Sequence, residues 1–286
     1  MKTLCVDLGG SRVKLALMTA DSHPQPDVFE VDSHAPLAQT LSLVAQHAAA
    51  WGQPDAVSIA LPCVVCRGTV IACNGKYTDA VGFDWMRWSQ KTFGAPVFLM
   101  NDAAAALLGE MRCGNARGFA NAALIALGTG LGFACCLDGE VQYAPTGSPR
   151  ITVYKKPFRD GILEDYVAKR GFLRLYGEIT GQDTGPSLTV ADLGRMAGEG
   201  NPAARETFAT IGRMLGEALR ELIRKERIEC LLLGGQISRS YAYLEPGLRK
   251  GLYGTACLRS IAPAAHIGHA AFYGLLARLD GLRPET

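Results

Sequence analysis

Three short glycine-containing turns, each following an apolar run, are the residues of this sequence best suited to chemistry. They read DLGGSRVK, LGTGLG and LLLGGQISRS. Backbone N–H groups that converge in such a turn bind phosphate, and glycine is needed where a Cβ would block its approach. Glycine also serves hairpin turns for purely conformational reasons, but three such turns together favour phosphate binding. The residues assigned to it are Gly9, Gly10, Ser11, Lys14, Gly128, Thr129, Gly130, Gly234 and Gly235.

A carboxylate stands just before the first turn. Asp7 ends an apolar run, where a charged group is costly unless it is paired. Beside a bound phosphate it can orient a Mg²⁺ ion through water, since Mg²⁺ keeps several of its waters in proteins. The alternative is a structural Asp held by hydrogen bonds.

A second carboxylate, Asp102, stands where the run VFLMN gives way to a helical pattern. One interpretation is a helix N-cap, which stabilises a helix by about 1 kcal/mol. The other is a catalytic base that accepts the proton of a substrate hydroxyl at the carboxyl edge of a strand. The two roles are compatible, because the helix dipole favours the ionised form.

The elements that must position these residues alternate between strands and helices through the first half of the chain. PLAQTLSLVAQHAAAWG has helical spacing, and the strand-like run APVFLM leads into the helical NDAAAALLGEM. This alternation predicts an α/β fold. The pattern of strand, glycine turn and strand occurs twice, in LCVDLGGSRVKLAL and AALIALGTGLGFACCL, which predicts a duplicated domain. Asn201-Pro202 marks the start of a long helix in the second half.

Composition narrows the class of protein. The 286 residues are 48% hydrophobic and carry a net charge of only +2, so no footprint for nucleic acid or an anionic membrane is visible. No apolar stretch approaches the roughly 18 residues of a membrane span, and no signal segment precedes the first strand pattern. We therefore expect a cytoplasmic protein.

Nine cysteines raise the question of disulfides. Cys5, Cys135, Cys136 and Cys230 lie in apolar strand-like runs, where free Cys behaves as a small hydrophobe. The remaining signal is a lone C-x-x-C at 63–66, which without a second pair is weak evidence for zinc or redox chemistry.

Together these segments resemble the ROK family of sugar kinases, in the superfamily of actin-like ATPases, heat-shock ATPases and hexokinases. DLGGSRVKLAL is similar to the family's first phosphate loop, LGTGLGFACCLDG to its second, and LLLGGQISRS to its adenosine loop. MNDAAAALLGE resembles its catalytic Asn-Asp-Ala segment, and ALPCVVCRGTVIACN the segment that ends in a sugar-binding Asn. The resemblance covers nearly the whole chain.

The resemblance implies roles for individual residues. Asp102 corresponds to the catalytic base, and Asn101 and Asn74 to sugar contacts. ILEDYVAKRGF is similar to the stretch that places a further sugar contact, here Glu164. The reaction implied is transfer of the γ-phosphoryl group of MgATP to a hydroxyl of a hexose or amino sugar, so the expected cofactors are ATP and Mg²⁺. Dimers are common in the family.

The implied fold consists of two ribonuclease H-like lobes, the actin-like ATPase fold, with a cleft between them. We expect a smaller lobe over 1–117, completed by a C-terminal helix at 270–286. The larger, nucleotide-binding lobe is expected over 118–269.

One region departs from the family pattern. The usual Gly-Glu-x-Gly-His segment and cysteine-rich zinc motif are replaced by EVQYAPTGSPRITVYKKPFRDG, which contains no His and no Cys. Zinc in structural sites takes four such ligands, so we expect no structural zinc. The loop is instead expected to be held by packing of Tyr154 and Phe158.

Three alternatives to an ATP-dependent kinase stay open. One is an inactivated homologue that only binds sugar or nucleotide, which the missing His and Glu favour and the retained Asp102 opposes. A second is a glucokinase that uses polyphosphate as donor. A third is a sugar-sensing repressor, which in this family carries a DNA-binding segment before the first phosphate turn.

Overall fold

The structure is a computed structural model whose chain forms two compact units, each described here by itself. It describes residues 1–10, 12–19, 21, 23–32, 34–73, 76–147, 149–183, 185 and 187–280. Two of the predicted site residues, Ser11 and Asn74, lie outside these ranges. The first unit comprises 1–114, 143–150 and 269–286, and the second comprises 115–142 and 151–268. None of the described helices is both long and apolar enough to cross a membrane.

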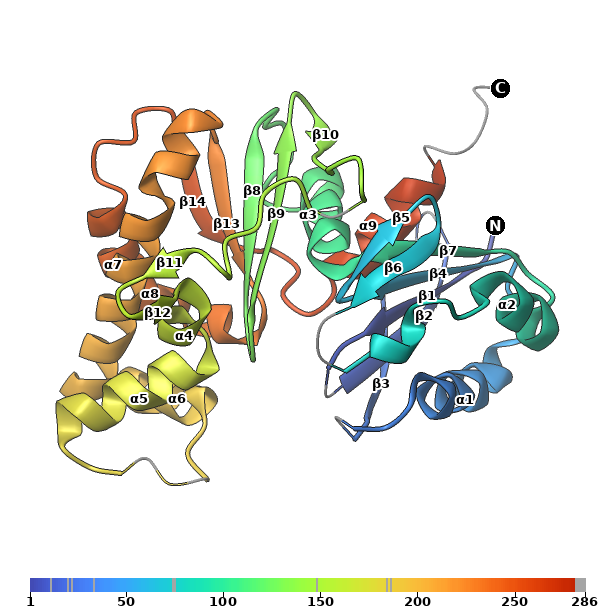
Figure 1. Cartoon of the computed structure of the whole chain (residues 1–286), viewed down its shortest axis with the longest axis horizontal. Coiled ribbons are helices and arrows are strands. Elements are labelled where there is room, and N and C mark those ends of the chain that lie inside the picture. Colours follow the sequence, from blue (N-terminus) through green and yellow to red (C-terminus); the bar gives the residue numbers. More distant parts are fainter. Residues whose placement is uncertain are drawn as a thin grey trace. The chain divides into compact units, whose positions relative to one another are not determined.

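A five-stranded sheet, in the order β3-β2-β1-β4-β7, forms the centre of the first unit (Figure 1). Its strands are β1 Thr3–Leu8, β2 Arg12–Met18, β3 Asp27–Glu30, β4 Ala56–Leu61 and β7 Val97–Asn101. The first three form an antiparallel meander, and β4 and β7 run parallel to β1. Every residue of β4 is buried, as expected for a parallel strand covered on both faces.

Four α-helices belong to this unit: α1 Leu37–Ala48, α2 Trp85–Phe93, α3 Asp102–Cys113 and α9 Ala270–Asp280. The C-terminal helix α9 packs against α3 with little space between them. A Cβ on Gly109 would lie 2.0 Å from the Ala270 carbonyl oxygen, and one on Gly274 would lie 1.8 Å from that of Ala105. Glycine is therefore required at both crossing points, and α9 is part of this unit's core.

The second unit repeats the same sheet. Its strand order is β10-β9-β8-β13-β14, again three antiparallel strands followed by two parallel ones. The strands are β8 Ala122–Leu127, β9 Leu131–Leu137, β10 Glu140–Val141, β13 Cys230–Gly234 and β14 Ser260–Pro263. The two sheets correspond strand for strand, which agrees with the duplication predicted from the repeated strand–turn–strand pattern.

The helices of the second unit are α4 Leu163–Val167, α5 Lys169–Thr180, α6 Val190–Gly198, α7 Pro202–Lys225 and α8 Tyr241–Gly251. Asn201 caps α7, accepting the Ala204 N–H at 2.9 Å, with Pro202 in the first turn as predicted. Helix α8 contains Pro246, which is unusual inside a helix, so the sequence pattern did not predict this helix. Its glycines let it approach α7 closely: a Cβ on Gly247 would lie 1.7 Å from the Ala209 carbonyl oxygen.

Two small hairpins complete the described elements, with the 3₁₀ turns η1 Ala49–Trp51, η2 Thr78–Ala80 and η3 Gln236–Ser240. In the first unit, β5 Cys63–Cys66 pairs with β6 Thr69–Cys73. This register sets Cys63 opposite Cys73, and the two form a disulfide. The sequence did not predict this pairing, because Cys73 lies outside the C-x-x-C motif at 63–66. Cys5, Cys135, Cys136 and Cys230 are buried free thiols, as expected.

The other hairpin, β11 Pro157–Phe158 with β12 Gly161–Ile162, belongs to the segment that replaces the family's zinc motif. Tyr154 and Phe158 pack against the core of the second unit, and the Phe158 ring meets that of Tyr166 edge to face at 5.3 Å. Packing of these aromatic side chains therefore holds the loop in place.

Candidate active site

The turn between β1 and β2 carries a buried ion pair. In the antiparallel register Asp7 lies opposite Lys14, and opposite residues project from the same face. The Lys14 Nζ lies 3.0 Å from the Asp7 Oδ2, and both side chains are about four-fifths buried. The carboxylate in the apolar run is thus paired, as its burial requires.

In the backbone of this turn, Gly9 is closely packed and Gly10 is not. A Cβ on Gly9 would lie 2.5 Å from the Arg12 carbonyl oxygen, whereas one on Gly10 would meet nothing within 4 Å. The buried Tyr77 donates its hydroxyl hydrogen to the Gly9 carbonyl oxygen at 3.0 Å. Sequence reasoning missed Tyr77, because no periodicity or motif links it to a turn that precedes it by so many residues.

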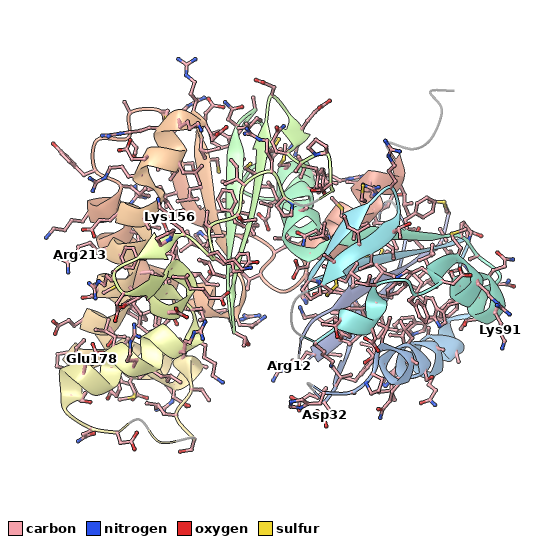
Figure 2. All side chains as sticks on the ribbon, in the orientation of Figure 1. Arg12, Asp32, Lys91, Lys156, Glu178 and Arg213 are labelled. Carbon is pink, nitrogen blue, oxygen red and sulfur yellow. A yellow bond between two sulfur atoms is a disulfide. The ribbon has the colours of Figure 1, made fainter. Side chains whose placement is uncertain are left out.

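Arg12 follows the turn at the start of β2, and its guanidinium reaches the surface (Figure 2). There it lies 3.3 Å from the Glu30 carboxylate, with both side chains largely exposed. An exposed pair of this kind contributes little stability, so the charge that matters within the turn is the buried Asp7–Lys14 pair.

Asp102 is the first residue of α3, directly after β7. Its Oδ1 accepts the Ala103 N–H at 2.8 Å, while the N-cap is the preceding Asn101, whose Oδ1 accepts the Ala104 N–H at 3.2 Å. The N-cap interpretation of Asp102 is therefore wrong by one residue. The cap and the carboxylate are separate side chains, so they can be tested separately.

The surroundings of Asp102 tune its acidity. Burial and, to a smaller extent, the negative charge of Asp7 raise the pKa of Asp102 to about 6, against hydrogen bonds that favour the ionised form. A carboxylate far away in the sequence thus influences the acidity of Asp102. A carboxylate with such a pKa is ionised at neutral pH and still accepts a proton readily, as a general base must.

Asn101 is held by the hairpin that contains the disulfide. Its Nδ2 donates to the Cys63 carbonyl oxygen at 3.3 Å, while its Oδ1 caps α3. An amide has two N–H donors and two acceptor lone pairs, so one of each remains for a substrate. The predicted sugar contact through Asn101 is compatible with this geometry and stays a prediction.

The second glycine turn joins β8 to β9 and is contacted by a side chain from helix α4. The Gly128 N–H donates to the Gly130 carbonyl oxygen at 3.1 Å, and a Cβ on Gly128 would meet nothing within 4 Å. Glu164, at the start of α4, accepts the Leu131 N–H at 2.8 Å through Oε2. A Cβ on Gly130 would lie 2.8 Å from that oxygen. Glu164 therefore supports the second turn, and its predicted contact with sugar stays a prediction.

The third turn lies beside the second, because β8 and β13 are parallel neighbours whose carboxyl ends share an edge of the sheet. Gly235 has φ +80°, and a Cβ there would lie 2.2 Å from the Leu127 carbonyl oxygen. The Ser238 hydroxyl donates to the Gly234 carbonyl oxygen at 2.6 Å. Glycine at 235 is thus required both by its backbone conformation and by the close approach of β8.

The residues present fit a phosphate-bearing cofactor with Mg²⁺. Gly10 and Gly128 leave open space where a Cβ would otherwise stand, so phosphate can approach the backbone there. Among the described residues, no three His, Cys, Asp or Glu side chains cluster as a metal cage would need. Mg²⁺ is bound in proteins through one or two carboxylates together with water and substrate phosphates, and Asp7 beside the first turn is such a carboxylate.

Comparison with known proteins defines the class. The ROK family model matches residues 3–150, more than half of the chain. The chain belongs to the ROK family.

Individual relatives agree with this assignment. The N-acetylgalactosamine kinase of Shewanella sp. (strain ANA-3) is 27% identical over 258 residues, covering 82% of this chain and 81% of the relative. The glucokinase of Streptomyces coelicolor is 25% identical over 167 residues, covering 51% of this chain and 53% of the relative.

Solved structures have the same fold. The ROK family glucokinase from Streptomyces griseus, solved with glucose and AMPPNP, is 21% identical, with a TM-score of 0.80 over 98% of this chain and all of that one. The inorganic polyphosphate/ATP-glucomannokinase from Arthrobacter sp. strain KM is 19% identical, with a TM-score of 0.71 over 99% of each chain. The predicted fold class is confirmed.

Proposed function

We propose that this protein is an ATP-dependent sugar kinase with Asp102 as its catalytic base. The observation that carries the proposal is the placement of Asp102 at the start of α3, with its pKa raised to about 6 by burial and by Asp7. A phosphoryl-transfer enzyme needs mainly positioning and charge stabilisation, and these carboxylates together with the open glycine turns supply both.

Asp102 accepts the proton of the substrate hydroxyl as the hydroxyl oxygen bonds to the γ-phosphorus. The bond from that phosphorus to the bridging oxygen breaks, and ADP leaves. Asp7 would hold a Mg²⁺ ion, and that ion would offset charge on the phosphates. The backbone at Gly10 and Gly128 is open to phosphate oxygens, and Lys14 keeps Asp7 in place.

Relatives suggest the substrate class. Their names specify N-acetylgalactosamine, glucose, N-acetylmannosamine and β-glucosides as substrates. We extend this to a hexose or N-acylated amino sugar as acceptor here, with Asn74, Asn101 and Glu164 as sugar contacts. The polyphosphate/ATP enzyme among the structural relatives keeps polyphosphate as the second donor to test. A cytoplasmic location and a homodimer belong to the same proposal.

A coupled assay of ADP release across hexoses, amino sugars and N-acylated amino sugars tests the proposal. We expect sugar-dependent turnover with MgATP that is absent in the Asp102→Asn variant. Turnover with polyphosphate but not with ATP would mean that polyphosphate is the phosphoryl donor, and the protein would still be a sugar kinase. If no sugar raised ADP release above the ATP-only rate, the kinase proposal would fail and the protein would be a binding homologue.

A further inference from the structure

A pocket of about 230 Å³ in the first unit is lined by several polar side chains, of which only Asn101 has a role in the proposed reaction. It lies among the turn of hairpin β5–β6, the end of β7, the segment 143–147 and the last turns of α9. Among the lining residues that the structure describes, the charged ones are Arg67 and Arg278, and none is a carboxylate. The pocket is therefore positive.

Two hydrogen-bonding groups at this pocket have no partner. Among the described residues, the Tyr143 hydroxyl and the Arg278 Nε are both shielded from solvent and make no hydrogen bond. Both residues line the same pocket, and the charge of Arg278 lowers the pKa of Tyr143 against the burial that raises it. Buried donors left unsatisfied are rare in proteins, so a pair of them beside one pocket indicates a missing acceptor.

The two arginines are also without counter-ions. Within the ranges that the structure describes, neither Arg67 nor Arg278 forms an ion pair, whereas Arg170 contacts both Glu164 and Asp165. Arg67 occupies the hairpin turn with φ +48° and lines the pocket. A guanidinium offers planar paired donors that match the oxygens of a carboxylate or phosphate.

The wall of the pocket is held by close packing, a β-bridge and a disulfide. Gly147 has φ +80°, and a Cβ there would lie 2.4 Å from the Val65 carbonyl oxygen, so Gly147 packs directly on the hairpin. Tyr143 and Pro149 form a bridge that closes the segment on itself. The Cys63–Cys73 disulfide ties the two strands of that hairpin together.

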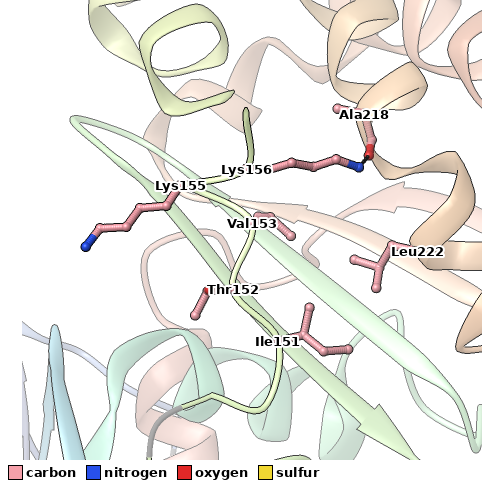
Figure 3. A pocket seen from close by; sticks show the side chains of 7 residues that line it. All are labelled: Ile151, Thr152, Val153, Lys155, Lys156, Ala218 and Leu222. Carbon is pink, nitrogen blue, oxygen red and sulfur yellow. Dashed lines mark hydrogen bonds between the residues drawn. The ribbon is translucent and has the colours of Figure 1, made fainter. Parts of the chain in front are cut away.

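A pocket of about 300 Å³ in the second unit provides a contrast (Figure 3). It is also basic, but the Lys156 ammonium donates to the Ala218 carbonyl oxygen at 2.5 Å, and Lys155 points away from the hollow. Its cation is already satisfied within the protein, so it offers a ligand mainly apolar surface. The first-unit pocket differs in having unsatisfied donors.

We propose that the first-unit pocket binds the acidic group of a small ligand, a carboxylate or a phosphate monoester, through Arg67, Tyr143 and Arg278. Such an oxyanion accepts the hydrogen bonds that Tyr143 and Arg278 leave unmade, and it balances both guanidinium charges. The acid is carried either by a sugar or by a separate small anion, and the chemistry of recognition is the same. The inference does not depend on kinase activity.

Calorimetric titration tests this binding without turnover. The probes are glucuronate, glucose 6-phosphate and inorganic phosphate at constant ionic strength, with glucose as the neutral control. The variants are Arg67→Asn, which suits a positive φ, Arg278→Gln and Tyr143→Phe. Arg87→Gln, an exposed arginine of α2 in the same unit, is the matched control for loss of charge.

We expect at least one acidic probe to bind the wild-type protein, with a dissociation constant that rises about tenfold in each arginine variant. The constant should be unchanged in Arg87→Gln. Tyr143→Phe should weaken binding severalfold while leaving the melting temperature equal or higher, because the deleted hydroxyl has no bond to lose. This last combination is not produced by general disruption of the fold.

The probes also distinguish the sources of the acid. Binding of the two sugar acids alone indicates an acid carried by a sugar, whereas equal binding of inorganic phosphate indicates a free anion. If none of the acidic probes binds, or if the three pocket variants bind as tightly as the wild type, the proposal is wrong. Because the readout is binding, that failure is distinguishable from failure of the kinase proposal.

Discussion

The two units contain the same strand–turn–strand hairpin, but the side chains beside the turn differ in charge. In the first unit, Asp7 lies opposite Lys14 just before the turn, whereas the corresponding positions of the second unit, Ala126 and Gly132, carry no charge. The carboxylate that supports the second turn comes from a different element, Glu164 on α4, and it binds backbone. The same sheet topology therefore carries a charged pair beside the turn in one unit and an uncharged pair in the other.

This difference indicates a division of labour within a duplicated fold. A turn without a charged pair offers a ligand backbone N–H groups and, here, the Thr129 hydroxyl, which suits a phosphate that must be held. The first turn adds Asp7, whose charge acts on Asp102 and raises its pKa. We therefore propose that proton transfer and metal positioning belong to the first unit.

The largest expected effect is that of Asp102→Asn. The variant keeps the helix cap, which belongs to Asn101, but loses the carboxylate that accepts the proton. We expect turnover to fall by about 10²- to 10⁴-fold with little change in melting temperature. Steady-state kinetics and a thermal melt on the same sample give both values. Activity within twofold of wild type would show that Asp102 is not the catalytic base.

Reduction of the Cys63–Cys73 disulfide should destabilise the first unit by about 2–3 kcal/mol, since the bond closes a short loop in the unfolded chain. No disulfide is described in the second unit, so hydrogen exchange of its amides should not respond. Cys73→Ser should reproduce the effect of reduction. Cys66→Ser, a free cysteine of the same hairpin, is the control and should remain sensitive to reductant.

Substitutions in the two turns should differ in stability. Gly9→Ala places a Cβ 2.5 Å from the Arg12 carbonyl oxygen, and we expect a loss of about 1–3 kcal/mol in the free energy of unfolding. Gly128→Ala has open space, so its loss should stay within about 0.5 kcal/mol while its KM for nucleotide rises. Urea denaturation measures the first quantity. Equal destabilisation by both substitutions would contradict the contrast between the turns.

The smallest expected effect is a pH dependence. Asp102 must be ionised to accept a proton, and its pKa is about 6, so kcat/KM should fall as the pH decreases through that value. Between pH 7 and pH 5 we expect a decrease of about tenfold. The residual activity of Asp102→Asn should lack this step. A flat profile in the wild-type enzyme would show that Asp102 is not the titrating group.

Local patterns were enough to predict much of the fold and of the site. The apolar runs around Gly9 and Gly128 predicted both hairpins, and Asn201-Pro202 predicted the start of α7. These features depend on residues close in sequence, where side-chain period and turn chemistry act directly. Helix α8 was missed because Pro246 interrupts its pattern, and its packing through glycine against α7 outweighs that local penalty.

The sequence by itself determined the three glycine turns, the acid before the first of them, and the Asn-Asp segment that follows β7. Only the tertiary structure decided which groups meet: Tyr77 on the Gly9 carbonyl, Glu164 on the second turn, Cys73 with Cys63, and the charge of Asp7 on Asp102. Each of these contacts joins separate elements, and no local periodicity encodes which elements will be neighbours. Burial supplies what the sequence lacks, because it partly desolvates the Asp102 carboxylate and so raises its pKa.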